Sequence, residues 1–282
     1  MWWTEVVLED DAQLWIDGRL LPAREATVAA IDHGLTVGDG AFETLQVING
    51  RPFAITRHIN RLHTTLEALA LPAPDHDLLS MAMSEVIAAN AVTAGRLRLT
   101  VTGGDGPLGS GAAYGTVRII AAAEPLGQEP VPVAVTVPWT RNESGALVGL
   151  KTTSYAENVR ALRYATGLGA GEALFANTRG RLCEGTGTNV FVVLGGDLFT
   201  PPLTAGCLAG VTRALVLEHT SARELDLPLE ALGEADDVLL TSSTRNVQIL
   251  SRVDDRDTGP AGRVALDAVA AFDALLAADL DP

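Results

Sequence analysis

Apolar and polar positions alternate over several short stretches early in the chain, and this two-residue period is typical of half-buried strands. Two pairs of such stretches are separated by dipeptides that suit the positive φ angles of tight hairpin turns. These pairs are residues 14–16 and 20–21 around Asp17-Gly18, and residues 42–48 and 52–55 around Asn49-Gly50. The chain is therefore predicted to begin with two β-hairpins.

A helical period follows the second hairpin. Ile59, Leu62, Leu66 and Leu69 recur at intervals of three or four residues, and they predict a helix that Thr56 caps. A second helix is expected over residues 75–90. Further predicted helices span residues 156–167, 211–219 and 264–278, and further predicted strands span residues 96–102, 116–122, 131–137, 172–177, 181–184, 190–194 and 237–241.

This mixture of hairpins and helices predicts an α+β fold, because strands and helices do not alternate regularly and no GxGxxG motif follows a strand. Three prolines and a glycine between residues 124 and 132 indicate a connection between domains. We expect an N-terminal α/β domain over residues 1–123, a linker over residues 124–130 and a C-terminal domain over residues 131–282.

Charge and composition narrow the class of protein. The formal net charge is −15, which argues against a nucleic-acid partner because such a partner needs a basic face. Cys183 and Cys207 form no CxxC motif, so neither a disulfide framework nor a metal site is expected. Residues 1–5 lack a basic region before an apolar run, and no stretch is long enough to span a bilayer. We therefore expect a cytoplasmic enzyme without a membrane partner.

Lysine occurs once among the 282 residues, at Lys151, whereas arginine occurs nineteen times. Arginine replaces lysine as a surface charge but not as an amine nucleophile, because the guanidinium keeps its proton at physiological pH. A Schiff base with a carbonyl group requires a lysine amine. Lys151 is therefore either the reactive amine of a site or a surface residue left by chance in a sequence that favours arginine. The residues around Lys151 are needed to choose between these two explanations.

Two features of the second half of the chain suit a phosphorylated ring. Glu184 ends a short strand, where a carboxylate can pair with a protonated ring nitrogen. Val211 and Thr212 open a helix directly after Gly210, and the exposed amides of a first helical turn attract an anion. Taken alone, the first feature is more simply explained as a turn carboxylate and the second as ordinary capping.

Two more features carry groups that bind phosphate. Ser242, Ser243 and Thr244 place hydroxyls where an apolar strand ends. Arg61 and His58 lie three residues apart on one helix face, and arginine is the natural partner of a doubly charged phosphate. A solvated turn and two solvent-facing charges are the simpler explanations of these features taken singly.

In this order, however, the segments resemble the class IV aminotransferases, the fold-type IV family of pyridoxal 5′-phosphate (PLP) enzymes. The resemblance covers most of the chain, with the order and spacing of the motifs intact. It implies a two-domain α+β fold with a smaller N-terminal α/β domain, and a larger C-terminal PLP-binding domain with a mixed, barrel-like sheet. It also implies a homodimer. The matching segments are residues 33–44, 58–62, 151–155, 172–174, 184–191, 200–202, 210–213 and 241–243.

The resemblance further implies roles for individual residues. Lys151 would form a Schiff base with the cofactor and move the proton during catalysis, and Glu184 would bind the pyridine nitrogen. The phosphate would be held by Arg61, the backbone amides of Val211 and Thr212, and the hydroxyls of Thr212, Ser242 and Ser243. The expected substrate pocket contains Phe42, Arg98, Tyr155 and Thr244.

Three activities share such a site: transamination of D-amino acids, transamination of branched-chain L-amino acids, and cleavage of aminodeoxychorismate to 4-aminobenzoate and pyruvate. The family's D-amino acid enzymes commonly carry an Arg-x-His carboxylate trap, which residues 103–110 lack. The substrate carboxylate then needs another arginine, with Arg24, Arg98 and Arg179 as the candidates.

We expect a PLP-dependent aminotransferase that moves an amino group between an amino acid, D-amino acids included, and a 2-keto acid. The lyase is the alternative, because the Lys151–Tyr155 segment and the glycine-rich loop resemble that branch. The branched-chain enzyme is less favoured, because its lysine and tyrosine are usually one residue further apart. A catalytically silent PLP-binding protein is the remaining hypothesis, against which the retained lysine, carboxylate and phosphate loops count.

Overall fold

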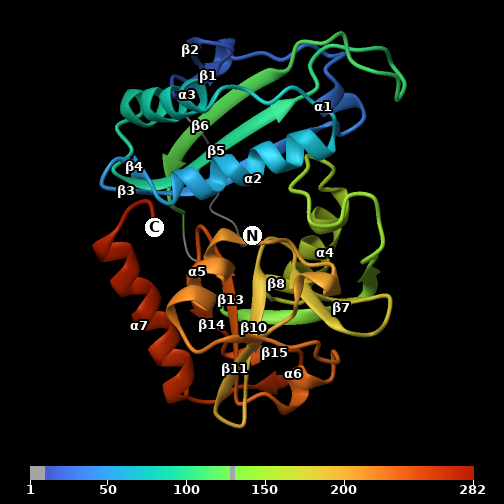
Figure 1. Cartoon of the computed structure of the whole chain (residues 1–282), viewed down its shortest axis with the longest axis vertical. Coiled ribbons are helices and arrows are strands. Elements are labelled where there is room, and N and C mark those ends of the chain that lie inside the picture. Colours follow the sequence, from blue (N-terminus) through green and yellow to red (C-terminus); the bar gives the residue numbers. More distant parts are fainter. Residues whose placement is uncertain (1–9, 128–130) are drawn as a thin grey trace. The chain divides into compact units, whose positions relative to one another are not determined.

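The computed structural model describes residues 10–127 and 131–282, and the chain forms two compact units (Figure 1). The described part of unit 1 comprises residues 10–127, 150–155 and 279–282. Unit 2 comprises residues 131–149 and 156–278. Residues 1–5 and positions 128–130 of the expected linker lie outside the described residues. The domain boundaries expected from the sequence stay a prediction, and Lys151 belongs to unit 1.

Unit 1 contains an antiparallel sheet, and both predicted hairpins are confirmed within it. Asp17 and Gly18 have φ angles of 47° and 88°, and Asn49 and Gly50 have φ angles of 50° and 74°, as tight primed turns require. The second hairpin is shorter than expected, because helix formation begins at Ile55. In sheet order the described strands are β2 (Arg19–Pro22), β1 (Gln13–Ile16), β6 (Arg118–Pro125), β5 (Ala94–Thr102), β3 (Gly40–Ile48) and β4 (Arg51–Pro52).

Helices α2 (Ile55–Ala68) and α3 (His76–Ala89) pack on one face of this sheet (Figure 1). The predicted apolar stripe is confirmed, because Ile59, Leu62 and Leu66 are buried in the core. The predicted cap is wrong: the N-cap of α2 is Ala54, and Thr56 lies inside the helix. A short α1 (His33–Thr36) and a 3-10 turn, η1 (Ala23–Glu25), complete the described elements of unit 1.

Unit 2 is built on two mixed sheets that share a hydrophobic core, which confirms the predicted α+β class with a mixed, barrel-like C-terminal sheet. The first described sheet has the order β12 (Arg223–Glu224), β11 (Asp197–Thr200), β10 (Asn189–Leu194), β13 (Asp237–Ser242) and β14 (Asn246–Ile249). The second has the order β16 (Arg256–Asp257), β15 (Arg252–Val253), β7 (Val133–Arg141), β8 (Glu172–Asn177) and β9 (Leu182–Gly185).

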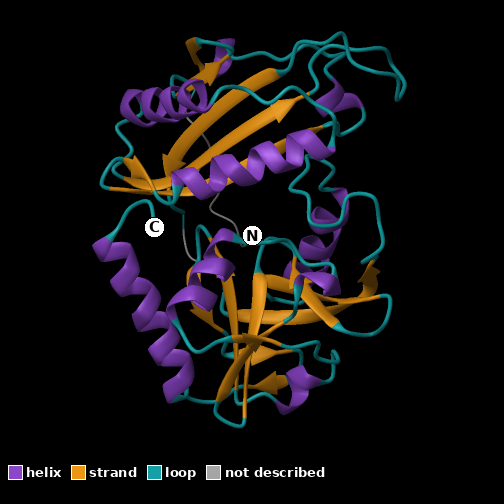
Figure 2. Ribbon diagram, viewed as in Figure 1, coloured by secondary structure: helices purple, strands orange, loops and turns teal. Residues whose placement is uncertain are grey.

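Helices cover these sheets as their apolar faces require. Ala161 and Ala165 of α4 (Ala156–Gly167) pack on β7 and β8. Helices α5 (Val211–His219) and α7 (Arg263–Ala278) contact each other (Figure 2). A short α6 (Ala231–Glu234) lies between β12 and β13 along the chain, and η2 (Leu203–Ala205) lies between β11 and α5. Among the described residues, no helix is long and apolar enough to cross a membrane.

Candidate active site

The backbone of Lys151 runs beside the first residues of β3. Its carbonyl oxygen accepts a hydrogen bond from the Phe42 amide at 3.0 Å, and the Thr153 amide donates to the Gly40 oxygen at 2.8 Å. The Lys151 amide donates to the hydroxyl of Thr65 on α2 at 3.3 Å. The only lysine of the chain therefore lies in a connecting segment that a strand and a helix both hold.

Two aromatic rings of the expected substrate pocket lie beside the Lys151 amine. Lys151 Nζ is 4.4 Å from the centre of the Phe42 ring and 5.9 Å from that of Tyr155. The two rings meet edge to face, with their centres 5.1 Å apart. Aromatic faces attract a cation and leave little room for water. This part of unit 1 therefore combines an amine with an apolar wall, as a nucleophilic lysine needs.

Arg98 of β5 packs on the Phe42 ring. Its guanidinium carbon is 3.3 Å from the centre of the Phe42 ring, and its Nε donates to the Thr100 hydroxyl at 3.3 Å. Desolvation against the ring lowers the pKa of Arg98 to about 10, so the group stays charged at neutral pH. Within the described part of the chain no carboxylate forms an ion pair with Arg98, and its charge is therefore available to an anionic group of a substrate.

The predicted phosphate ligand Arg61 is held by a buried carboxylate. Glu43 occupies a helix-facing position of β3 and is 1% exposed. Arg61 Nε donates to one Glu43 oxygen at 2.8 Å and Arg61 Nη2 to the other at 2.6 Å. His58 Nδ1 lies 2.6 Å from Glu43. Glu43 thus holds the Arg61 guanidinium in position through Nε and Nη2, without the need for a bound anion.

The same contacts fix the charge states of this cluster. Burial alone would raise the pKa of Glu43, but Arg61 and His58 outweigh that effect and lower the pKa to about 2. Burial lowers the pKa of His58 by more than the neighbouring Glu43 raises it, and the positive charge of Arg61 lowers it slightly further. An ionised carboxylate can only accept, so neutral His58 donates to it through Nδ1.

Unit 2 holds the predicted ring-nitrogen partner, Glu184, near the end of β9. One Glu184 oxygen accepts a hydrogen bond from the Leu208 amide at 2.9 Å, and the other lies 3.4 Å from Arg141 Nε. Arg141 also pairs with Glu157 at 2.5 Å and stacks over the ring of Phe175 at 4.2 Å. Arg141 therefore places a fixed positive charge beside the Glu184 carboxylate.

A second buried carboxylate, Glu172, organises the turn that follows Glu184. It accepts hydrogen bonds from the Thr186 amide at 3.0 Å and the Thr188 hydroxyl at 3.1 Å. Arg245 Nη2 lies 3.4 Å from the same carboxylate, and the Arg245 amide donates to the Ser242 hydroxyl at 3.1 Å. Glu172 thus links the turn after Glu184 to the turn that carries Ser242.

The predicted anion donors of unit 2 lie at a helix start and at a strand end. Gly210 is the N-cap of α5 and provides no side-chain cap, so the amides of Val211 and Thr212 lie in an uncapped first turn. A Cβ atom at Gly210 would meet Asn189 Oδ1 at 2.0 Å, so the position of the Asn189 side chain favours glycine here. Strand β13 ends at Ser242, and Ser243 and Thr244 follow directly. These backbone and hydroxyl donors suit a phosphate.

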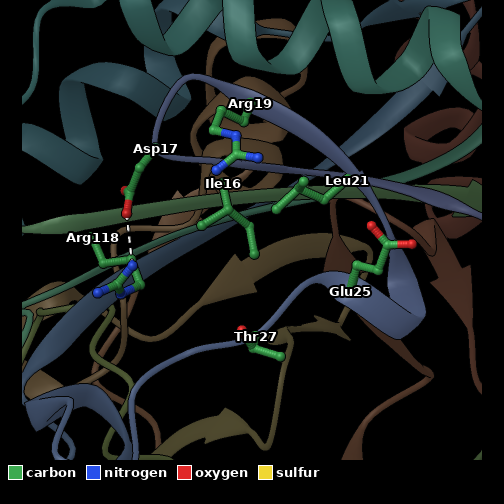
Figure 3. A pocket seen from close by; sticks show the side chains of 7 residues that line it. All are labelled: Ile16, Asp17, Arg19, Leu21, Glu25, Thr27 and Arg118. Atoms are coloured by element: carbon green, nitrogen blue, oxygen red, sulfur yellow. Dashed lines mark hydrogen bonds and ion pairs between the residues drawn. The ribbon is translucent and has the colours of Figure 1, made fainter.

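A cavity of about 340 Å³ also opens at the β1–β2 hairpin of unit 1 (Figure 3). Its lining residues include Arg19, Glu25 and Thr27, and none of the predicted site residues. Arg118, which also lines it, is already paired with Asp17 at 2.7 Å (Figure 3). We therefore assign this cavity no part in the candidate site.

Sequence reasoning missed the residues that support the site rather than form it. A charged residue at a core-facing position of an alternating strand was the available signal for Glu43, which lies between Ala41 and Leu45. Glu172 similarly begins a strand in which every residue is buried. No pattern in the sequence singles out Arg141, because its partners Glu157 and Glu184 lie far along the chain.

Comparisons with known proteins point to one family. The sequence profile of the family described as amino-transferase class IV matches residues 40–253. A putative branched-chain-amino-acid aminotransferase of Methanocaldococcus jannaschii is 30% identical over 257 residues, which cover 86% of this chain and 88% of that protein. A bifunctional aminodeoxychorismate lyase / D-amino acid transaminase of Mycobacterium tuberculosis is 30% identical over 238 residues, 78% of this chain and 82% of that one. The crystal structure of the Escherichia coli branched-chain amino acid aminotransferase has a TM-score of 0.87 at 26% identity and covers 94% of both chains.

Proposed function

Because this chain belongs to the class IV aminotransferase family, whose members use PLP, we propose that it transfers an amino group between an amino acid and a 2-keto acid. The observation that carries this proposal is the setting of Lys151. The chain has no other lysine, and this one has its amine on an aromatic wall next to the charged Arg98. That setting suits an amine that reacts with a carbonyl beside a bound carboxylate.

The residues of the chain fit the cofactor by the chemistry of their donors. We assign Glu184 to the pyridine nitrogen, because its carboxylate lies at a strand end beside Arg141. We assign the phosphate to Arg61 and to the donors of unit 2. Those donors are the amides of Val211 and Thr212 and the hydroxyls of Thr212, Ser242 and Ser243.

Each residue has a distinct task in this proposal. Bound PLP withdraws electron density from the substrate Cα and so makes its proton acidic. Lys151 would take that proton from the substrate Cα and pass it to the C4′ carbon of the cofactor, because its amine is released when the substrate amine replaces it. Glu184 keeps the ring nitrogen protonated, and Phe42 and Tyr155 exclude water from the Lys151 amine. Thr244 remains a candidate for the substrate pocket.

Arg98 is our choice among the three arginines considered for the substrate carboxylate. Arg24 lies 3.5 Å from Glu25, and Arg179 lies 3.2 Å from Glu143. Arg98 shares the Phe42 ring with the Lys151 amine. A charged partner near the reacting amine would orient the substrate at both ends. The homodimer and the cytoplasmic location expected from the sequence stay predictions.

The lyase remains the second candidate, since one relative is named for both a lyase and a D-amino acid transaminase activity. The test is the visible spectrum of purified, PLP-loaded protein before and after adding D-alanine, D-glutamate or L-leucine in separate samples without keto acid. Bleaching of the long-wavelength band by one of them supports transamination and gives its chirality. A band that no amino acid bleaches contradicts the proposal, and release of pyruvate from aminodeoxychorismate would then favour the lyase.

A further inference from the structure

Helix α2 begins without the local cap that helices normally have. Its N-cap residue is Ala54, which has no side chain that can accept from the first-turn amides. Ala54 has a φ angle of 52°, a left-handed conformation that non-glycine residues rarely adopt. The start of α2 is therefore both uncapped by its own sequence and held in a strained conformation, and it needs partners from elsewhere.

Those partners come from residues 280–282, at the opposite end of the sequence. The Ala54 amide donates to the Leu280 oxygen at 2.7 Å. Asp281 accepts from the Thr56 amide at 2.9 Å and from the Thr56 hydroxyl at 2.6 Å. Arg57 Nε donates to the Pro282 oxygen at 2.7 Å. Three consecutive tail residues thus bind the first turn of α2, and Asp281 takes the position that an N-cap carboxylate normally has.

The helix that this tail holds carries three groups of the candidate site. His58 and Arg61 follow Thr56 by about half a turn and about 1.4 turns. Both bind Glu43 on β3, and Thr65 accepts from the Lys151 amide. Fraying of the first turn would free His58 first and then loosen Arg61, because an uncapped helix unwinds from its end.

We propose that the segment Asp279–Pro282 is a clamp on α2, and that Asp281 is a positioning residue for Arg61. The proposal rests on the phosphate-binding role assigned to Arg61 above. The carboxylate of Asp281 adds a favourable charge to the positive end of the helix dipole as well as two hydrogen bonds. The tail therefore contributes to phosphate binding without touching the phosphate.

The test compares Asp281→Ala with Asp273→Ala, which removes an exposed acid of α7 that forms no ion pair with any residue the structure describes. Hydrogen–deuterium exchange of the apoprotein reports on α2 directly, and Kd values for PLP and for pyridoxal, which lacks the phosphate, report on Arg61. We expect Asp281→Ala to speed exchange at residues 56–61 and to raise the Kd for PLP about threefold to tenfold. The Kd for pyridoxal should stay constant, and Asp273→Ala should change neither quantity. Asp281→Asn, which keeps one acceptor oxygen, should fall between.

Three results would overturn the proposal, and each has a different meaning. Unchanged exchange in α2 shows that the tail does not cap the helix. Faster exchange with an unchanged Kd for PLP shows a stabilising cap that does not position Arg61. A wild-type protein that binds pyridoxal as tightly as PLP removes the phosphate role of Arg61, and with it the proposed function's assignment, whatever the variants do.

Discussion

In unit 1 the charged side chains of the candidate site hold one another in position through ion pairs and hydrogen bonds. In unit 2 backbone groups provide many of the corresponding hydrogen bonds. Glu43 is bound by His58 and Arg61, two side chains of a helix. Glu184 accepts from a backbone amide, and the expected phosphate donors include the first amides of α5. Side-chain pairs fail when one partner is lost, but backbone donors stay in place as long as their helix or strand does. The two units should therefore respond differently to substitution.

The largest effect is expected at Lys151. Lys151→Arg keeps a positive charge in unit 1 but removes the amine that, under the proposed function, forms a Schiff base and moves a proton. The transamination rate should fall by at least about 10³-fold, because both functions are lost together. The rate is measured with the amino acid that bleaches the wild-type protein, and sustained turnover by the variant would refute the assignment.

Glu184→Gln tests the corresponding residue of unit 2. The amide keeps an acceptor for the Leu208 backbone and should leave the fold intact, but under the proposed assignment it would no longer hold the ring nitrogen protonated. We expect kcat to fall on the order of 10²-fold, as for other lost electrostatic contacts in active sites. The thermal midpoint of the apoprotein serves as the control and should change little. An unchanged kcat would place the ring-nitrogen partner elsewhere.

Glu43→Gln should damage unit 1 as a structure, unlike Glu184→Gln in unit 2. It leaves Arg61 without its buried anionic partner, so the free energy of unfolding should fall by about 3–5 kcal/mol. Urea unfolding of the apoprotein measures this change. If the free energy of unfolding falls as little for Glu43→Gln as expected for Glu184→Gln, the two units do not differ in the way described above.

The pH dependence of the free energy of unfolding offers a second test of the Glu43 cluster. The pKa of Glu43 is lowered from 4.5 to about 2 in the folded protein. The ionised Glu43 carboxylate therefore makes its full contribution to the free energy of unfolding above pH 4.5. It is lost as the pH falls from there towards 2, and the loss amounts to about 3 kcal/mol. Glu43→Gln should lack this part of the acid dependence, which parallel urea titrations at pH 6, 4 and 3 would show.

The smallest effect is expected at Arg141, which touches Glu184 only at 3.4 Å. Arg141→Met removes its charge but keeps an apolar side chain on Phe175. We expect about a tenfold fall in kcat, with KM nearly unchanged, since the charge acts through Glu184. The matched control is Glu157→Gln, which removes the other partner of Arg141 and should leave kcat close to the wild-type value. Equal losses in the two variants would mean that Arg141 only stabilises the fold.

The same contrast explains which parts of the site were visible in the sequence. Glu184 and the Gly210-Val211-Thr212 start of α5 follow local rules for strand ends and helix starts, and the structure has these elements at the predicted places. The α+β class and most helices were likewise predictable from periodicity. The cap of α2 was not, because Thr56 binds Asp281, 225 positions away, and no local pattern encodes such a pair. Arg141 was missed for the same reason, whereas Glu43 had a local signal in its charge at a core-facing position of a strand.

The hydrogen bonds between the Lys151 segment and β3 have a further consequence. Strand β3 is paired on one side along its whole length by β5, but on the other side β4 covers only its last residues. Residues 151–153 cover its beginning. An uncovered strand edge is a template for pairing with other chains. The segment that carries Lys151 should therefore also protect the protein from aggregation, and substitutions that displace its backbone should reduce the yield of dispersed protein before any effect on turnover can be measured.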